Sequence, residues 1–315
     1  MLAKLFVVLQ FVLPKYWLTA LVRRITRIRH PATKDYLITR FVRLFDVDID
    51  EVLLNVPEDF STFNDFFIRE LKDDARRIDN DVNTIVSPVD GTVSNAGNIN
   101  AGSIIQAKGI DYSLEDLLAT DLDEALAYEN GCFATIYLAP HNYHRVHMPF
   151  DGELFAARYV PGDLFSVNAA TVASVKGLFR RNERLIMHFE TAHGTGVLIF
   201  VGALNVGSIS TPWSGELRPR KRGVVDALDI TTHATNIQKG DLLGWFNMGS
   251  TVILLLSENS CRWDDVLKPG ARLRMGDAIG KYRAADKWAT GGPHQGRLLH
   301  SAGRQCCSAC GGTFF

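Results

Sequence analysis

The sequence has no excess of either charge. Its 315 residues include 34 Lys+Arg and 35 Asp+Glu, so the formal net charge is −1. A chain without a positive surplus is not expected to bind nucleic acid through its overall field, and we expect no nucleic-acid partner. Hydrophobic residues make up 46% of the chain and charged residues 22%, which provides material for a core and excludes wholesale disorder.

Cysteines are few and unevenly placed. The chain has five, and Cys306, Cys307 and Cys310 are crowded into the last ten residues. An odd count with this crowding argues against a disulfide framework and fits a reducing compartment. Residues 284–315 are rich in glycine and show no hydrophobic period, so we expect a mostly disordered tail. A structural zinc site needs four ligands at workable spacing, which adjacent cysteines do not favour, and we expect no metal there.

The sequence also lacks an apolar run long enough to cross a bilayer. Residues 5–14 and 16–22 are uncharged runs of ten and seven residues, whereas a span needs about 20. A signal peptide is conceivable, but positive charges continue after these runs and no clear cleavage site follows. The pattern favours amphipathic helices in a membrane interface, with Trp17 near the headgroups and arginines facing anionic lipid; helices packed on their own domain are the alternative. No acid precedes Asp35, whereas the basic residues up to that point are Lys4, Lys15, Arg23, Arg24, Arg27, Arg29 and Lys34.

The hydrophobic patterns predict an α+β fold, with amphipathic amino-terminal helices followed by a β-rich domain of antiparallel sheets. Three phenylalanines at helical spacing in 63–67, after Ser61 or Thr62 as an N-cap, predict a short helix with a core face. We divide the chain into a helical region at 1–60, the β-rich domain at 61–283 and the tail at 284–315. Strands are predicted at 133–138, 184–190, 196–201 and 251–256, and helices at 113–118 and 164–175.

Two segments carry candidate catalytic side chains among turn-like sequence. Asp90 precedes Gly91, and an Asp-Gly pair by itself indicates a hairpin turn. His141, His144 and His147 are three of the nine histidines. On a strand the middle one would face away from the other two, and no nearby Glu or Cys completes a ligand set. A catalytic histidine with supporting neighbours is therefore favoured over a metal site.

A third segment combines small residues with the start of an apolar strand. Gly249 and Ser250 precede the run at 251–256, which could be only a strand beginning at a glycine bulge. The esterase elbow G-x-S-x-G does not fit, because Met248 and Val252 occupy both glycine positions. Asp90, His147 and Ser250 form an Asp–His–Ser set in chain order. Triads are defined by geometry, so the sequence leaves open whether these three meet.

Taken together, these residues resemble the phosphatidylserine decarboxylases of the bacterial membrane-bound type. Met248-Gly249-Ser250-Thr251 is similar to the Leu-Gly-Ser-Thr motif at which that family cleaves itself. The resemblance runs from about residue 1 to 283, with Met248 in place of the usual Leu. Its further marks are LPKYWLT at 13–19, TFNDFF at 62–67, QAKG at 106–109, YHRVHMP at 143–149 and YVPGDLFSVN at 159–168.

The resemblance implies a self-processed, pyruvoyl-dependent lyase that converts phosphatidylserine to phosphatidylethanolamine and CO2 in phospholipid biosynthesis. Ser250 Oγ would attack the Gly249 carbonyl, and elimination would leave a pyruvoyl group as the covalent cofactor at the new amino terminus. His147, oriented by Asp90, resembles the base of this step. The pyruvoyl group would form a Schiff base with the lipid amine, and His144 resembles the residue that reprotonates the product carbon, although the sequence does not separate its role from that of His147. If both serve one pocket, the segment between Pro140 and Pro149 must bend.

The same resemblance implies partners and a location. The cut would leave a larger β chain ending at Gly249 and a smaller α chain beginning at Ser250, held together as a heterodimer, and it suggests a homodimer of such pairs. The substrate is a membrane lipid, so we expect peripheral attachment to the anionic cytoplasmic face of the inner membrane. Leu164 and Phe165 are candidates for a lid over the headgroup, with an ordinary packed loop as the alternative.

Two other functions remain compatible with the residues alone. A self-processing serine hydrolase acting on lipid esters would keep its serine hydroxyl after maturation and would need an oxyanion hole. A membrane-tethered β-domain without activity would use Gly249-Ser250-Thr251 only to begin a strand. The masses of the purified fragments separate both from a pyruvoyl enzyme.

Overall fold

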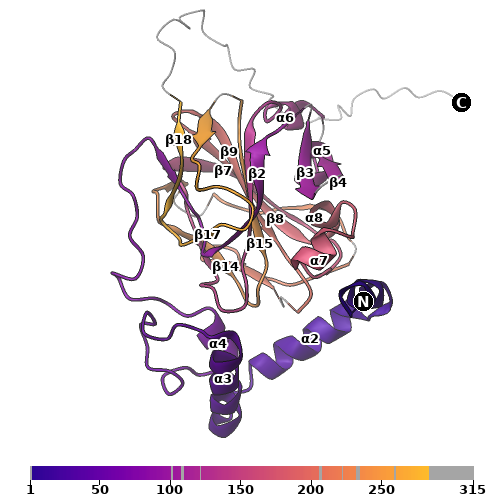
Figure 1. Ribbon diagram of the computed structural model, residues 1–315, viewed down its shortest axis with the longest axis vertical. Coiled ribbons are helices and arrows are strands. Elements are labelled where there is room, and N and C mark those ends of the chain that lie inside the picture. The colour runs from indigo at the N-terminus through magenta and orange to yellow at the C-terminus, as the bar shows by residue number, and fades with distance from the viewer. Residues whose placement is uncertain are drawn as a thin grey trace, which may run out of the picture. The chain divides into compact units, whose positions relative to one another are not determined.

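Three helices form the amino-terminal region, as the charge and apolar pattern predicted. The computed structural model places α1 at Leu2–Val12, α2 at Lys15–Thr26 and α3 at Pro31–Phe45 (Figure 1). It describes residues 2–100, 102–107, 110–120, 122–205, 208–221, 223–231, 235–258 and 260–283, all within a unit that ends at Arg283. The tail at 284–315, with Cys306, Cys307 and Cys310, lies outside the described residues.

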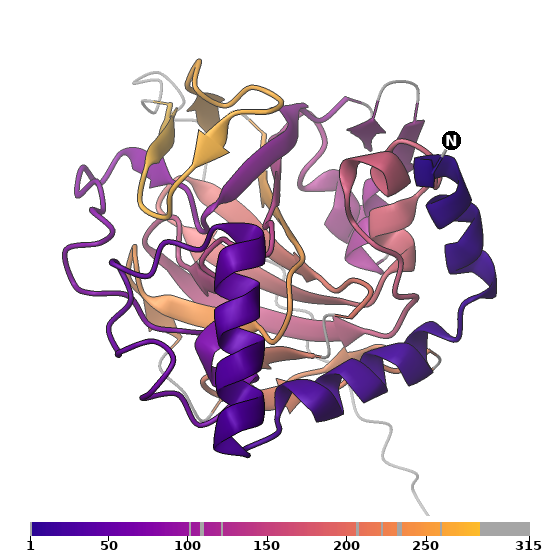
Figure 2. The same cartoon turned by 60° about the horizontal axis from the view of Figure 1, so that its bottom comes forward.

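Prolines divide these helices. Pro14 separates α1 from α2, and Pro31 occupies the first turn of α3, where a missing N–H costs nothing. Seen in Figure 2, α3, α2 and α1 follow one another along one side of the β-rich part. Within the described ranges no single helix is long and apolar enough to span a membrane; Leu5–Val12 and Lys15–Thr26 pass that test only as a pair bent by 95°.

A small second core attaches α3 to the rest of the chain. The helix α4, at Phe63–Phe67, begins as predicted, because the Thr62 hydroxyl accepts a hydrogen bond from the Asp65 N–H at 3.1 Å. Phe41 of α3 packs edge-on against Phe63, with ring centroids 5.1 Å apart. This core takes residues from both sides of residue 60, namely Ile38, Val47, Val52, Phe60, Phe63, Phe66 and Phe67.

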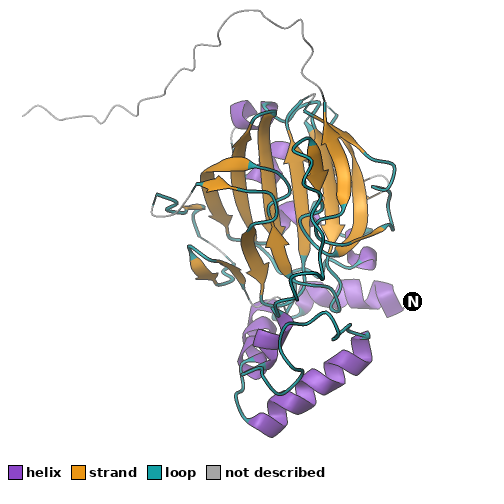
Figure 3. Cartoon of the chain, turned by 90° about the vertical axis from the view of Figure 1, so that its left-hand side faces the viewer, coloured by secondary structure: helices purple, strands orange, loops and turns teal. Residues whose placement is uncertain are grey.

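The largest sheet holds the main core and is antiparallel throughout, as the fold class predicted (Figure 3). Its strand order is β12-β7-β8-β9-β15-β5-β2-β17, with β13 paired to β7. The predicted strands at 133–138, 184–190, 196–201 and 251–256 are all present. The bounds are β2 Gly91–Asn98, β5 Cys132–Tyr137, β7 Gly152–Val160, β8 Arg184–Thr191, β9 Gly194–Val201, β12 Asp226–Ala227, β13 Asn236–Ile237, β15 Thr251–Leu256 and β17 Arg272–Leu273.

Smaller sheets and helices surround this one. One sheet pairs β11-β10-β14-β6, another pairs β1-β18-β16, and β3 pairs with β4. Residues 88–90 are therefore a junction between two sheets and not a hairpin, because β1 pairs with β18 while β2 pairs with β5 and β17.

The strands are β1 Thr84–Val86, β3 Ser103–Ala107, β4 Ile110–Ser113, β6 Arg145–His147, β10 Ile209–Thr211, β11 Gly215–Leu217, β14 Leu242–Phe246, β16 Cys261–Trp263 and β18 Ala278–Tyr282; the helices are α5 Leu114–Leu118, α6 Leu122–Leu126, α7 Ala169–Val172 and α8 Leu178–Arg181.

Two local predictions differ in extent from the structure. The helix expected at 113–118 forms as α5 with Ser113 as its N-cap. The helix expected at 164–175 shortens to the four residues of α7, because the Asn168 side chain caps its first turn and accepts the Thr171 N–H at 3.0 Å. Residues 164–168 form a loop before it.

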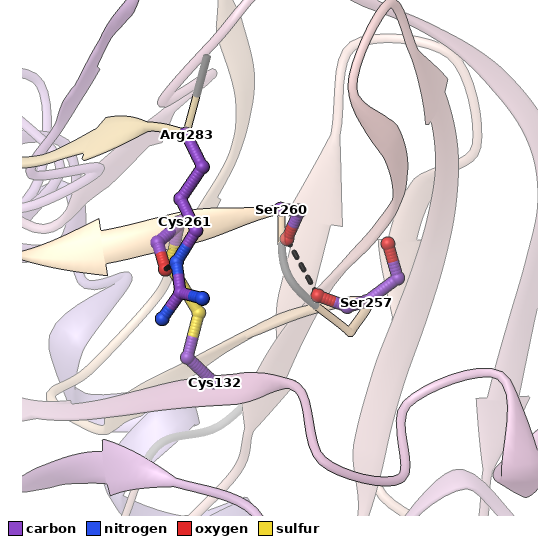
Figure 4. The surroundings of a disulfide bond; sticks show 5 residues. All are labelled: Cys132, Ser257, Ser260, Cys261 and Arg283. Carbon is purple, nitrogen blue, oxygen red and sulfur yellow. Dashed lines mark hydrogen bonds between the residues drawn. A yellow bond between two sulfur atoms is a disulfide. The ribbon is translucent and has the colours of Figure 1, made fainter. Parts of the chain in front are cut away.

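One disulfide joins Cys132 at the start of β5 to Cys261 at the start of β16 (Figure 4). The cysteine count did not predict this pair, because a count contains no information about which strands become neighbours. The two cysteines are 129 residues apart and lie on opposite sides of the Gly249–Ser250 bond.

Candidate active site

Ser250 lies directly before the most buried strand of the main sheet. Its carbonyl accepts the Leu138 N–H at 2.9 Å, and Thr251 then pairs with Tyr137 on β5 and Val201 on β9. The side chain is fully buried, and its Oγ has no hydrogen-bond partner in the described part of the chain. A buried hydroxyl without a partner loses its bonds to water and gains none, so an unreacted Ser250 carries an energetic cost.

The residue three positions earlier in the chain is firmly held. Asn247 is buried, and its Nδ2 donates to Ser208 Oγ at 2.7 Å and to Ser210 Oγ at 3.0 Å. Its Oδ1 accepts a hydrogen bond from Asn64 of α4 at 3.1 Å. Only Met248 and Gly249 therefore separate this anchor from Ser250.

His144 is the imidazole beside Gly249. A Cβ added at Gly249 would lie 3.2 Å from His144 Nε2, which is closer than ordinary van der Waals contact. The ring is fully buried and lies against Phe67 at a centroid distance of 4.1 Å, with the two planes tilted by 38°. Neither ring nitrogen makes a hydrogen bond of normal geometry to a described residue. Burial, and then the charge of Arg69, lower the pKa of His144 well below its usual value, so the ring is neutral at pH 7.

His147 is also neutral, and its tautomer is set by its partners. Nδ1 lies 2.7 Å from the Gly240 carbonyl, to which it can only donate, and Nε2 lies 3.0 Å from the Tyr143 hydroxyl. Nε2 is therefore the basic nitrogen, and Tyr143 donates to it. Burial lowers the pKa of His147, while the Gly240 hydrogen bond and the charge of Asp90 act in the opposite direction.

Asp90 forms an ion pair with Arg76. Arg76 Nε donates to Asp90 Oδ1 at 2.8 Å, a second guanidinium nitrogen bonds Oδ2, and the Met275 N–H donates to Oδ1 at 2.8 Å. The described hydrogen bonds thus do not join Asp90 to His147, and Asp90 acts on that ring through its charge. The structure brings His144 to Gly249. No described hydrogen bond joins His147 or Asp90 to Ser250.

The segment that carries both histidines bends where the prolines indicated. Only Arg145–His147 forms a strand, and residues 140–142 form a turn. Arg69, which we did not single out from the sequence, holds this turn by donating to the His141 and Asn142 carbonyls at 2.9 and 3.3 Å. It is buried, and burial lowers its pKa to about 10. Its position two residues after the helical phenylalanine stripe was the only signal available in the sequence.

A cavity of about 370 Å³ opens at Gly249, and we call it the reaction cavity. Its walls combine aromatic residues of α3 and α4 with residues from four loop segments and the last residue of β5. The lining is Phe41, Phe45, Phe67, Tyr137, Leu138, Pro140, Ser166, Val167, Ala203, Leu204, Asn205, Met248 and Gly249. It is thus within the size range of small-molecule sites and mostly apolar.

Leu164 and Phe165, the two lid candidates, do not line this cavity. Both are buried, and the Phe165 ring lies 5.1 Å from Phe11 of α1 and 3.3 Å from Lys15 Nζ of α2. The next two residues, Ser166 and Val167, form part of the wall instead. In the loop at 164–168, the residues that line the cavity are thus Ser166 and Val167, two positions after those that the sequence suggested. Phe165 is not available because it packs against α1 and α2.

Comparisons with known proteins identify the family of this chain. A family model described as phosphatidylserine decarboxylase matches residues 63–281, and one described as PSD matches residues 5–46. The chain belongs to the phosphatidylserine decarboxylase family. Proteins named phosphatidylserine decarboxylase proenzyme are similar to it: that of Alcanivorax borkumensis is 45% identical, covering 90% of this chain and 98% of the relative. That of Methylococcus capsulatus is 42% identical, covering 89% and 97%, and that of Saccharophagus degradans is 42% identical, covering 89% and 98%.

A testable prediction concerns Gly249, because proteins of the phosphatidylserine decarboxylase family are named as proenzymes and this glycine has little room for a side chain. At the 249–250 bond, the expected site of self-cleavage, Gly249→Ala should slow cleavage at least tenfold. The added methyl group would lie 3.2 Å from His144 Nε2 and 3.4 Å from the Leu138 carbonyl oxygen, and relief of this crowding would shift the Gly249 carbonyl away from Ser250 Oγ. Gly97→Ala is the matched control, since its Cβ would meet only Phe133 at 3.8 Å. Gel analysis of cleavage over time measures the effect, and cleavage of Gly249→Ala at the wild-type rate would contradict it.

Proposed function

We propose that this chain is a proenzyme that cuts itself between Gly249 and Ser250 and then converts phosphatidylserine to phosphatidylethanolamine and CO2. The observation that carries the proposal is the buried, unpartnered Ser250 Oγ, next to a glycine whose missing Cβ leaves room for the imidazole of His144. A serine that is consumed during maturation needs no lasting partner. The family and the proenzyme names of its relatives support the same reading.

The residues present fit the formation of a pyruvoyl group at Ser250. Ser250 Oγ attacks the Gly249 carbonyl carbon, the C–N bond breaks, and an ester replaces the amide. Elimination then releases the Gly249 carboxylate and leaves dehydroalanine, which water converts to the pyruvoyl group with loss of ammonia. That group supplies the carbonyl that binds the amine of the lipid and accepts the electron pair left when CO2 departs.

This chain's own residues would provide the proton transfers. We assign His147 as the base of the cleavage step, with Nδ1 held by Gly240 and its charge state influenced by Asp90. We assign His144, beside the reacting backbone, to reprotonation of the product carbon. The apolar walls of the reaction cavity would exclude water from the step at which a carbanion forms.

The first prediction concerns the products of cleavage. The active protein should consist of chains of 249 and 66 residues, about 27 and 7 kDa at ~110 Da per residue. Mass spectrometry must be run after reduction, because the Cys132–Cys261 disulfide joins the two chains and would return the mass of the whole. Ser250→Ala should stay uncut. Full activity from a single reduced species of 35.0 kDa would overturn the proposal.

A second prediction separates the histidines. His147→Ala should remain uncut, whereas His144→Ala should cut and then fail to release CO2; exposed His141 provides the control, and His141→Ala should do both. Burial lowers the pKa of both site histidines below the usual value of an imidazole, so the loss of cleavage that protonation of the base causes should begin at a lower pH than the titration of a free imidazole. A His144→Ala chain that stays uncut would transfer the role of base to His144.

We further propose peripheral attachment to a membrane through α1 and α2. Several large apolar side chains of these helices are exposed, among them Val12 at 77% and Trp17 at 78%. Four of the basic residues, however, do not face outward. Arg23 and Arg27 both bind Glu216 at 2.8 Å, Lys15 pairs with Asp163 at 3.1 Å, and Lys34 pairs with Asp35. Arg24 and Arg29 are left as the exposed arginines of this region.

The third prediction follows from this division of charges. In co-sedimentation of uncut Ser250→Ala protein with liposomes, neutralising Arg24 and Arg29 to Gln should remove about 1 kcal/mol each of the preference for anionic lipid. Trp17→Ser should weaken binding to neutral and anionic liposomes alike, and Val82→Ser, at another exposed site, should leave it unchanged. Equal binding of the unmodified helices to neutral and anionic liposomes at low salt would refute the electrostatic part.

Location and assembly complete the proposal. We place the enzyme on the cytoplasmic face of the inner membrane, although the Cys132–Cys261 disulfide is of a kind that is rare in reducing compartments. Thiol labelling in intact cells would show whether Cys132 and Cys261 are oxidised, and so whether the enzyme lies in a reducing compartment. The two cleavage chains would remain a heterodimer because β15 pairs with β5 and β9 of the larger chain. A homodimer stays a prediction of the family resemblance.

A further inference from the structure

A second hollow lies between the amino-terminal helices and next to the reaction cavity. It measures about 280 Å³, and we call it the helix cleft. Ile25 of α2 and Leu37 and Leu44 of α3 line it, together with Phe41, Phe63 and Met248. Phe41 and Met248 also line the reaction cavity. The two hollows thus share a wall made of these two side chains.

The backbone that carries Met248 is held at both ends before the cut. On one side Asn247 is anchored to Ser208, Ser210 and Asn64. On the other side the Ser250 carbonyl accepts the Leu138 N–H, and β15 begins at the next residue. Cleavage between Gly249 and Ser250 removes the second restraint. Met248 then becomes the penultimate residue of the larger chain, with Asn247 as its nearest anchor.

We propose that the helix cleft receives one acyl chain of the lipid substrate, and that self-cleavage opens the way by freeing Met248 from the shared wall. The inference rests on the proposed function, because it assumes the cut at Gly249. Before the cut Phe41 and Met248 stand between the reaction cavity and the cleft. After it, Met248 moves on a two-residue carboxy-terminal segment, and an acyl chain in the cleft reaches the reaction cavity past Phe41.

The chemistry of the cleft matches an acyl chain attached to a phosphate. Its lining is apolar apart from Thr26 and Arg40. Ile25 is exposed on α2, one of the two helices of the proposed membrane contact, and Leu44 is exposed on the neighbouring α3. Arg40 is exposed at the cleft, and none of the described carboxylates forms an ion pair with it. A free guanidinium beside an apolar cleft suits the phosphate of a glycerophospholipid. Methionine is unbranched and adaptable, which suits a wall that must move.

A cross-linking experiment tests the opening itself. Cut wild-type protein and uncut Ser250→Ala protein are bound to phosphatidylcholine vesicles that carry a diazirine at mid-chain, a lipid without the reacting serine. Labelling of peptides that contain Phe41 and Met248 should be at least fivefold higher in the cut protein, while labelling at exposed Trp17 should be equal. Equal labelling at Phe41 in both proteins would overturn the coupling to cleavage.

A substrate comparison tests the occupant. Leu37→Trp fills the cleft away from the cleaved bond, and should lower the ratio of kcat/KM for dioleoyl- over dihexanoyl-phosphatidylserine about tenfold, mainly through KM. Leu54→Trp, at an exposed position outside the cleft, should leave this ratio unchanged. An unchanged ratio in Leu37→Trp would refute the acyl-chain assignment. Failure of the proposed function is distinct, because wild-type protein would then release no CO2 from either lipid.

Discussion

The pairing of β15 between β5 and β9 is the constraint on which the site depends. All six residues of β15 are buried, and both neighbours hold it in continuous antiparallel register. The strand therefore cannot slide, and the residue directly before it has a fixed position. Because Asn247 is anchored to β10 and α4 by its side chain, the two residues between anchor and serine form a short, defined bridge. Ser250 and the Gly249 carbonyl are presented to one another by this bridge.

Burial then decides the chemistry of the groups around the bridge. Desolvation is the largest influence on the pKa of His144 and of His147, and in both it disfavours the imidazolium. A neutral ring can accept a proton from a hydroxyl, so the same burial that costs folding free energy prepares a base. Arg69 adds to this effect at His144, while its hydrogen bonds shape the turn that brings the ring to Gly249.

The amino-terminal helices have a structural role beside their proposed membrane contact. Although burial raises the pKa of Glu216, hydrogen bonds from Arg23 and Ser208 prevail and lower it to about 2. Ser208 in turn accepts a hydrogen bond from Asn247, so a continuous polar chain connects α2 to the segment before the scissile bond. Arg23 and Arg27 thus orient α2 against the β-rich part, and several apolar side chains of α1 and α2 remain exposed.

The sequence by itself determined the fold class, the main strands and the family. Hydrophobic periodicity and capping residues act locally, so β15, α4 and the bend at 140–142 could be predicted from neighbouring residues. The motif around Gly249 and Ser250 was sufficient to indicate self-cleavage.

Tertiary structure alone decided which side chains meet, because contacts such as His144 with Gly249, Arg76 with Asp90 and Cys132 with Cys261 join residues far apart in the chain. It also turned Arg23 and Arg27 inward and placed Ser166 and Val167, in place of Leu164 and Phe165, at the reaction cavity. Residue patterns specify which face of an element is apolar, whereas the partner that covers that face is set by packing across the whole molecule.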